Sequence, residues 1–218
     1  MSILRNKTFR VAVAIAAVAG AITGAVFLHR AYYLRDVGVV VPGKLYRCRQ
    51  PRGWQWQALQ RHRITKVINL RPRAEEPGIF DEQIRVLREE GVEFVNIPVP
   101  TPLPTEQQYI QFIREVRSAP GAVLFHCAHG RNRTGFMAAA YMIVMHGWTV
   151  EKAMADLESY NPEFESTESV LKRRQLVQTL TQMANNRQGW RVKTAPAAGG
   201  GATTPTTAPA TAPATRGT

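Results

Sequence analysis

One stretch of the sequence, residues 122–135 (AVLFHCAHGRNRTG), brings a cysteine, two histidines, two arginines and two glycines close together. It begins as a short apolar run typical of a buried strand and leads through a tight loop into a predicted helix. Backbone amides after Cys127 can all point inward if the loop wraps around a centre, and the positive end of the helix adds to them. Gly130 allows a backbone turn that a side chain would obstruct. The stretch therefore predicts a nest for a tetrahedral dianion.

Cys127 and Arg133 are the candidate reactive residues of this nest. An ordinary thiol is only a few per cent ionised at pH 7, but the loop amides, the helix end and Arg133 all favour the thiolate. The planar fork of Arg133 can grip two phosphoryl oxygens as charge spreads over them, which lysine does less well. The sequence thus predicts a nucleophilic sulfur at the mouth of a phosphate-binding loop formed by Ala128, His129, Gly130, Arg131, Asn132 and Arg133.

The spacing of His126-Cys127, five residues, then Arg133-Thr134-Gly135 resembles the signature of the cysteine-based protein tyrosine and dual-specificity phosphatases. Residues 43–51 (GKLYRCRQP) and 67–71 (VINLR) resemble further segments of the small atypical dual-specificity phosphatases. The likeness covers roughly residues 36–186, so it spans the whole predicted domain.

The resemblance implies a mechanism. Cys127 attacks phosphorus to give a phosphocysteine, Arg133 binds the phosphate, Thr134 helps the thiolate leave, and His126 orients the loop and tunes the cysteine. No metal and no organic cofactor is implied. The expected substrate is phosphotyrosine in a protein. The alternatives are an inositol polyphosphate or phospholipid head group attacked in the same way, and a phosphate-recognition module without catalysis.

The chain departs from the family at the general acid. In many members an aspartate follows the strand that corresponds to residues 94–98, but here the usual site falls near Thr101. No aspartate occurs between Asp81 and Asp156, so the acid is Glu106, Asp81 or absent. A missing acid slows the departure of a phenoxide less than that of an alkoxide, which favours aryl or phosphoanhydride leaving groups.

Short apolar runs alternate with longer helical patterns between residues 36 and 186. The predicted strands are 65–70, 92–99 and 122–125, which are β-branched and bounded by Gly or Pro. The predicted helices are 53–62, 80–90, 105–118, 134–146, 150–160 and 166–185, the last with Leu171, Leu176, Leu180 and Met183 on one face. This alternation predicts an α/β fold with a parallel-type central sheet flanked by helices, and functional groups at the carboxyl ends of the strands. The resemblance implies the phosphotyrosine phosphatase-like version of that fold.

The net charge of +12 comes mostly from the two ends of the chain. Residues 1–35 carry five basic side chains and residues 187–218 carry four, with no acid in either segment. A basic stripe for groove binding would lie on the folded domain, so nucleic acid is not an expected partner. Within the domain, residues 44–73 hold nine basic side chains that either attract polyphosphates or form a solvated face: Lys44, Arg47, Arg49, Arg52, Arg61, Arg63, Lys66, Arg71 and Arg73.

Two end segments frame the domain. Residues 11–28 are free of charge and long enough to cross a bilayer as a helix, so residues 1–35 are predicted to be a membrane anchor, with a cleaved signal peptide as the alternative. The denser positive charge before this helix favours an extracytoplasmic domain, and a small-residue stripe along it suggests a dimer. Residues 187–218 are predicted to be a disordered tail rich in Ala, Thr, Pro and Gly.

Cys48 is the second of only two cysteines. Two cysteines exclude a disulfide scaffold and a cysteine-rich zinc fold. Cys48 is interpreted as a packing residue, with capture of oxidised Cys127 in a disulfide as the alternative.

Overall fold

Five short strands form the central sheet in the order β1-β2-β5-β3-β4. The computed structural model describes residues 7–32, 37–100, 103–161 and 167–196. Strands β2, β5, β3 and β4 are parallel, whereas β1 pairs antiparallel with β2, so the sheet is mixed and the predicted parallel-type sheet is right only for those four strands. The strands are β1 (Gly38–Val41), β2 (Leu45–Arg49), β3 (Ile64–Asn69), β4 (Glu93–Asn96) and β5 (Ala122–Cys127).

The sequence prediction missed β1 and β2. Both are only four or five residues long, and β2 carries two arginines, so neither shows the apolar run of a central strand. Strand β4 is shorter than predicted because Pro98 and Pro100 follow it and cannot donate to a ladder. The chain still runs beside β3 after β4 ends, since the amides of Ile97 and Val99 donate to the carbonyls of Asn69 and Leu70.

Strand β5 lies in the middle of the sheet, and all six of its residues are buried. Its side chains alternate between the two faces: Ala122 and Leu124 join one hydrophobic cluster, and Val123, Phe125 and Cys127 join the other. Burial on both sides explains why this strand has a continuous apolar sequence.

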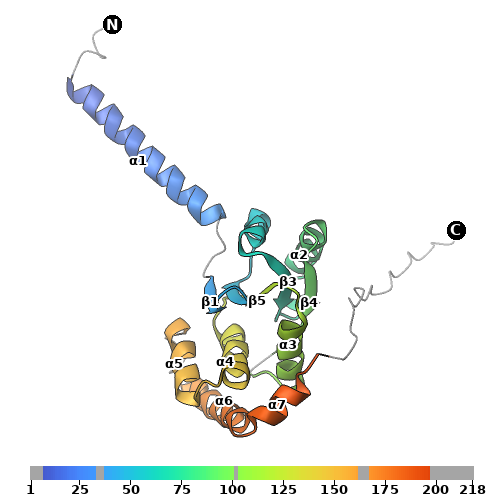
Figure 1. The fold of residues 1–218 in the computed structure, drawn as a ribbon. Helices are drawn as coiled ribbons and strands as arrows, with labels where there is room; N and C mark the ends of the chain where they lie inside the picture. Colours follow the sequence, from blue (N-terminus) through green and yellow to red (C-terminus); the bar gives the residue numbers. More distant parts are fainter. Residues whose placement is uncertain (1–6, 33–36, 101–102, 162–166, 197–218) are drawn as a thin grey trace, which may run out of the picture.

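One face of the sheet is covered by two helices, the 3-10 helix η2 (Gly53–His62) and α2 (Pro77–Glu89), which Figure 1 shows on the same side. Trp56 and Leu59 of η2 and Leu87 of α2 are buried against the sheet there. A short 3-10 turn, η3 (Arg73–Glu75), leads into α2, which begins with proline at its first position, where no amide donor is needed.

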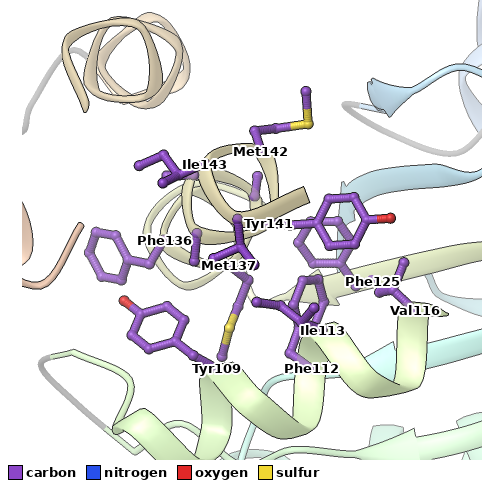
Figure 2. Close-up of a cluster of buried hydrophobic side chains, with 14 of the residues drawn as sticks. Tyr109, Phe112, Ile113, Val116, Phe125, Phe136, Met137, Tyr141, Met142 and Ile143 are labelled. Atoms are coloured by element: carbon purple, nitrogen blue, oxygen red, sulfur yellow. The ribbon is translucent and has the colours of Figure 1, made fainter. Parts of the chain in front are cut away.

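The opposite face carries the larger core and the remaining helices of the domain (Figure 1). Figure 2 shows that aromatic and aliphatic side chains of α3 and α4 meet Phe125 of β5 in this core. Helix α4 is buried on nearly every side, which matches its apolar sequence. The helices are α3 (Glu106–Ser118), α4 (Asn132–His146), α5 (Val150–Tyr160), α6 (Thr167–Asn185) and α7 (Arg187–Lys193).

The predicted helices agree with the observed ones to within a few residues, with two differences. Segment 53–62 is a 3-10 helix, and Leu171 does not belong to the buried face of α6. Leu176, Leu180 and Met183 are fully buried, but Leu171 is 65% exposed because the first turns of α6 extend beyond the core.

Helix α7 corrects the predicted end of the domain. The segment from residue 187 was expected to be disordered, yet Trp190 is buried in the larger core and Thr194 is fully buried. The folded domain therefore reaches at least residue 194 instead of ending at 186. The rest of the predicted tail, residues 197–218, lies outside the described residues.

Helix α1 (Lys7–Tyr32) precedes the domain. Its segment Phe9–Val26 has a mean hydropathy of 2.0 over 18 residues, and none of it is buried within the protein. The helix is therefore long and apolar enough to cross a membrane, as its sequence predicts.

Candidate active site

The loop after β5 wraps back onto the sulfur of Cys127. Gly130 has a φ of 72°, and its amide donates to Cys127 Sγ at 3.3 Å. A Cβ atom at Gly130 would lie 2.7 Å from the backbone nitrogen of Arg49, so the loop rests directly on the end of β2. Both the left-handed backbone and the close approach require glycine here. Helix α4 starts at Asn132, so its positive end faces the same loop.

Cys127 is 5% exposed, and neither cysteine is in a disulfide. Cys48 pairs with His126 in the register of β2 and β5 and packs in the cluster under η2, whereas Cys127 packs in the larger core. Because the two sulfurs lie on opposite faces of the sheet, they cannot be joined without rearranging the strands. In this state Cys48 is fully buried as a packing residue. The capture of oxidised Cys127 by Cys48 stays an alternative, and it would need a rearrangement of the strand ends.

Arg133 is held by an acidic residue that the sequence analysis did not select. Its two terminal nitrogens donate to the Glu75 carboxylate at 2.6 and 3.1 Å, and one of them also donates to the Pro100 carbonyl at 3.3 Å. Glu75 accepts a further bond from Arg71 at 3.0 Å. The carboxylate thus orients the guanidinium through a two-point contact. Glu75 follows β3 at the sheet edge where the loop lies, and this placement was the available sequence signal.

The same contacts control the charge of Glu75. Partial burial raises the pKa of its carboxyl, but the hydrogen bonds and positive charges of Arg133 and Arg71 outweigh burial and hold the pKa below its ordinary value. Glu75 is therefore a carboxylate at neutral pH. It is suited to orienting a cation and poorly suited to donating a proton.

The other predicted loop residues fall into two groups. His129, Arg131 and Asn132 are exposed, and Ala128 is partly exposed, so this part of the loop faces solvent. Thr134 is fully buried, and its hydroxyl donates to the Arg131 carbonyl at 3.2 Å, which ties the loop to the first turn of α4. Asn132 accepts a hydrogen bond from the side chain of Asn161 at the end of α5.

His126 is completely buried beneath the loop on the α2 side of the sheet. Its Nε2 lies 2.8 Å from Nε2 of Gln83, and its Nδ1 lies 3.4 Å from the Cys127 carbonyl. Burial lowers the pKa of His126 to about 3, although the bond to the Cys127 carbonyl opposes the change and the charge of Arg71 adds to it. The imidazole is therefore neutral.

The structure does not bring either predicted general acid to the loop. Glu106 is exposed at the start of α3 and pairs with Lys193 at 2.7 Å. Asp81 is exposed on α2 and pairs with Arg73 at 2.9 Å. Thr101, near the usual acid position, lies outside the described residues. Among the described carboxylates, Glu75 is the one in contact with Arg133.

Several cations of the basic segment are paired with acids at the edge of the site. Arg71 is 7% exposed and bonds to Glu75 and Glu76. Arg52 pairs with Glu76 at 3.0 Å, and Asp81 neutralises Arg73. Neutralisation weakens the attraction of this edge for a polyanion. Within the described ranges, no group of three metal-binding side chains comes together.

Comparison of this sequence with known proteins identifies the family to which the chain belongs. The sequence profile of the dual specificity phosphatase catalytic domain matches residues 45–182. The dual specificity protein phosphatase TpbA of Pseudomonas aeruginosa is 30% identical over 116 residues, which are 52% of this chain and 50% of TpbA. A human phosphatidylglycerophosphatase and protein-tyrosine phosphatase is 35% identical over 80 residues, 35% of this chain and 38% of that protein. The chain thus spans about half the length of TpbA and less of the human protein.

Solved structures share the fold. TpbA of P. aeruginosa in complex with phosphotyrosine has a TM-score of 0.55 and 23% identity, covering 73% of this chain and 90% of that one. The catalytic core of the PP-IP phosphatase SIW14 of S. cerevisiae, in complex with citrate, has a TM-score of 0.57 and 16% identity, covering 72% and 95%. At these identities the likeness is one of fold.

Proposed function

Since the chain belongs to the dual specificity phosphatase family, we propose that it hydrolyses phosphate monoesters through a phosphocysteine on Cys127. The observation that carries this proposal is the hydrogen bond of 3.3 Å from the Gly130 amide to Cys127 Sγ, at the amino end of α4. An amide donor and a helix amino terminus both stabilise a thiolate. A phosphate dianion beside that sulfur would meet the inward loop amides.

The proposed reaction has two steps. In the first, the Cys127 thiolate forms a bond to phosphorus while the bond from phosphorus to the leaving oxygen breaks, and that oxygen takes up a proton from solvent water. Arg133, oriented by Glu75, stabilises the charge that spreads over the phosphoryl oxygens. In the second, water attacks phosphorus and the thiolate leaves, with Thr134 as the proposed assisting group. Inorganic phosphate is then released, the proton of the attacking water passes to solvent, and the free thiolate is regenerated.

The proposed substrate is phosphotyrosine in a protein. Glu106 and Asp81 are both engaged in ion pairs with basic residues, and Glu75 is held as a carboxylate. A leaving group that departs without strong acid assistance suits such a site, and a phenol of pKa about 10 departs more readily than a Ser or Thr alkoxide. The ion-paired arginines at the edge of the site favour a monoester over an inositol polyphosphate.

A substrate panel tests the proposal. The full chain in detergent, under reducing conditions, is offered an aryl phosphate, a phosphotyrosyl peptide, a phosphothreonyl peptide and an inositol polyphosphate. We expect turnover of the first two, and a loss of at least about a thousandfold in Cys127→Ser. Cys48→Ser makes the same chemical change on the other face of the sheet and is expected to keep the activity. If the substrate carries a radioactive phosphoryl group, acid quenching during turnover should trap that group on Cys127.

Each other outcome has a defined meaning. Equal turnover by wild type and Cys127→Ser would refute the mechanism. Preference for the inositol polyphosphate would reassign the substrate, and phosphate binding without turnover would identify a recognition module.

We also propose that α1 anchors the domain to a membrane. Its length and hydropathy support this reading. Residues 17–19 (AVA) and 19–21 (AGA) fit the small-residue pattern that a signal peptidase cuts, but the apolar run continues past both of them to Leu28. The denser positive charge ahead of the helix supports an extracytoplasmic domain.

A further inference from the structure

A buried line of hydrogen bonds runs from the backbone amide of Arg71 through two side-chain amides to the imidazole of His126, beside the candidate nucleophile. The Arg71 amide donates to Asn69 Oδ1 at 2.8 Å, and Asn69 Nδ2 donates to Gln83 Oε1 at 2.9 Å. Gln83 Nε2 then lies 2.8 Å from His126 Nε2. The side chains of Asn69, Gln83 and His126 are at most 1% exposed, and they come from β3, α2 and β5. The comparisons assign no role to Asn69 or Gln83.

The hydrogen bonds along this line all donate in one direction, because the backbone amide of Arg71 at its start can only donate. A backbone N–H of Arg71 must face an oxygen, which fixes Oδ1 of Asn69 on that side and turns Nδ2 toward Gln83. Gln83 must then present its oxygen to Asn69 and its NH₂ group to the ring. His126 Nε2 therefore has to accept, and it carries no hydrogen.

The other side of the ring leads independently to the same result. His126 Nδ1 lies 3.4 Å from the Cys127 carbonyl oxygen, which can only accept. Nδ1 must carry the hydrogen for this contact to be a hydrogen bond. In the opposite tautomer, Nε2–H would face an NH₂ group and the Nδ1 lone pair would face a carbonyl oxygen. Both contacts would be repulsive in an interior where no water can reach them.

We propose that Asn69 and Gln83 are positioning residues that hold His126 as the neutral Nδ1–H tautomer, so that the ring donates to the backbone carbonyl of Cys127. This inference deepens the proposed function and depends on it only for the importance of Cys127. The relay ties the carbonyl of the nucleophile to β3 and α2 just before the loop amides turn inward. It also gives a role to two amide side chains that are almost completely buried.

Nitrogen-15 NMR of the full chain in detergent micelles reports the tautomer directly. In wild type we expect a protonated Nδ1 and an unprotonated Nε2 on His126 from pH 5 to 8. The decisive variant is Asn69→Asp, which does not touch the ring. Its carboxylate still accepts from the Arg71 amide, but it forces Gln83 to turn over and present its oxygen to His126. The ring proton should then move to Nε2.

The ionisation of the new carboxyl provides an internal check. Its carbon-13 signal shows when it is charged, and the Nε2–H form should appear only then, because a protonated carboxyl donates to Gln83 as Asn69 does. Asn186→Asp makes the same change at an exposed residue and should leave the ring signals unchanged. If Asn69→Asp does not fold, Gln83→Glu serves instead, with a second proton on His126 expected once the glutamate is charged.

Activity gives a second readout. With Asn69→Asp we expect kcat/KM to fall at least about tenfold, because the Cys127 carbonyl loses its donor. A hydrogen on Nε2 and none on Nδ1 in wild type would overturn the proposal, and so would a ring whose Nε2 still lacks a hydrogen beside a charged carboxylate in the folded variant. Absence of turnover in wild type would refute the proposed function while leaving the NMR result intact.

Discussion

Glu75 and Arg133 show how one residue contact shapes the candidate site. A carboxylate with two bonds to the guanidinium fixes the plane of the fork but also places a negative charge near the expected phosphate. A phosphate dianion carries more charge than one carboxylate, so it can compete for the same cation. The pair therefore orients the Arg133 guanidinium for the transition state, but it weakens the binding of the phosphorylated substrate in the ground state.

Substitution of Glu75 by glutamine separates these two effects. In Glu75→Gln we expect kcat to fall by about tenfold, because the fork loses its two-point contact, and KM to fall as well, because the repulsion of the phosphate is removed. Steady-state kinetics with an aryl phosphate measures both constants. Glu76→Gln is the matched control, since Glu76 pairs with Arg52 and Arg71 and has no ion pair with Arg133. An unchanged kcat in Glu75→Gln would show that Arg133 needs no such support.

The buried His126 makes stability depend on pH. Its pKa is about 3 in the folded protein and about 6.5 when the chain is unfolded, so between these values the unfolded chain binds a proton that the folded protein does not. The contribution of His126 to the free energy of unfolding is fully present above pH 6.5. It is lost as the pH falls toward 3, and the total loss is at most about 5 kcal/mol.

Urea unfolding at a series of pH values tests this dependence. His126→Asn, which does not titrate, should show a flatter decline than wild type between pH 6.5 and 4. His129→Asn, which removes an exposed imidazole, should follow wild type. Equal slopes in wild type and His126→Asn would mean that the buried ring is protonated in the folded protein.

At the scale of elements, α4 is stabilised from both ends. Its amino end follows the loop that carries Gly130, and its carboxyl end is capped by α7. Arg187 donates to the Ile143 carbonyl, and Arg191 donates to those of Val144 and Met145, each at 2.9 Å. These are carbonyls of the last turn, which lack partners within the helix. Helix α7 therefore supports the helix on which the site is built.

Removing the apolar contact of α7 should weaken the whole domain. Trp190 is 7% exposed in the larger core, so Trp190→Ala should lower the free energy of unfolding by about 3 kcal/mol. Val192→Ala shortens a neighbouring side chain that is 67% exposed, so it should change the free energy of unfolding by less than about 0.5 kcal/mol. Denaturant unfolding measures both. Equal stability of the two variants would mean that α7 is not part of the cooperative unit.

At the scale of the whole molecule, an apolar helix precedes a domain whose own core is already complete. None of the segment Phe9–Val26 is buried, so this segment contributes nothing to that core. Its 18 residues of high hydropathy are long enough to cross the hydrocarbon layer of a membrane.

Membrane fractionation tests this arrangement. We expect the full chain to sediment with membranes, to resist alkaline carbonate and to need detergent for release, whereas a chain lacking residues 1–35 should remain in the supernatant with its activity intact. Sequencing of the mature amino terminus distinguishes the alternative, because a cleaved signal peptide would leave a shorter chain. A full-length, uncleaved chain that is soluble without detergent would contradict the anchor.

Features that depend on neighbours along the chain can be predicted from consecutive residues. Six helices follow from apolar periodicity, the apolar amino-terminal helix from its length and hydropathy, and the family from the spacing of Cys127, Arg133 and Gly135, which the family match over residues 45–182 confirms. These features need no knowledge of distant partners, because local periodicity and a continuous loop are written in consecutive residues.

Tertiary structure alone decided which distant residues meet. It brings Glu75 to Arg133 across 58 positions and Gln83 to His126 across 43, and it separates Cys48 from Cys127 although their strands are adjacent. It also buries Trp190 in a segment whose composition predicts disorder. Such contacts depend on strand order and on the face to which each side chain points, and a one-residue change of register reverses that face.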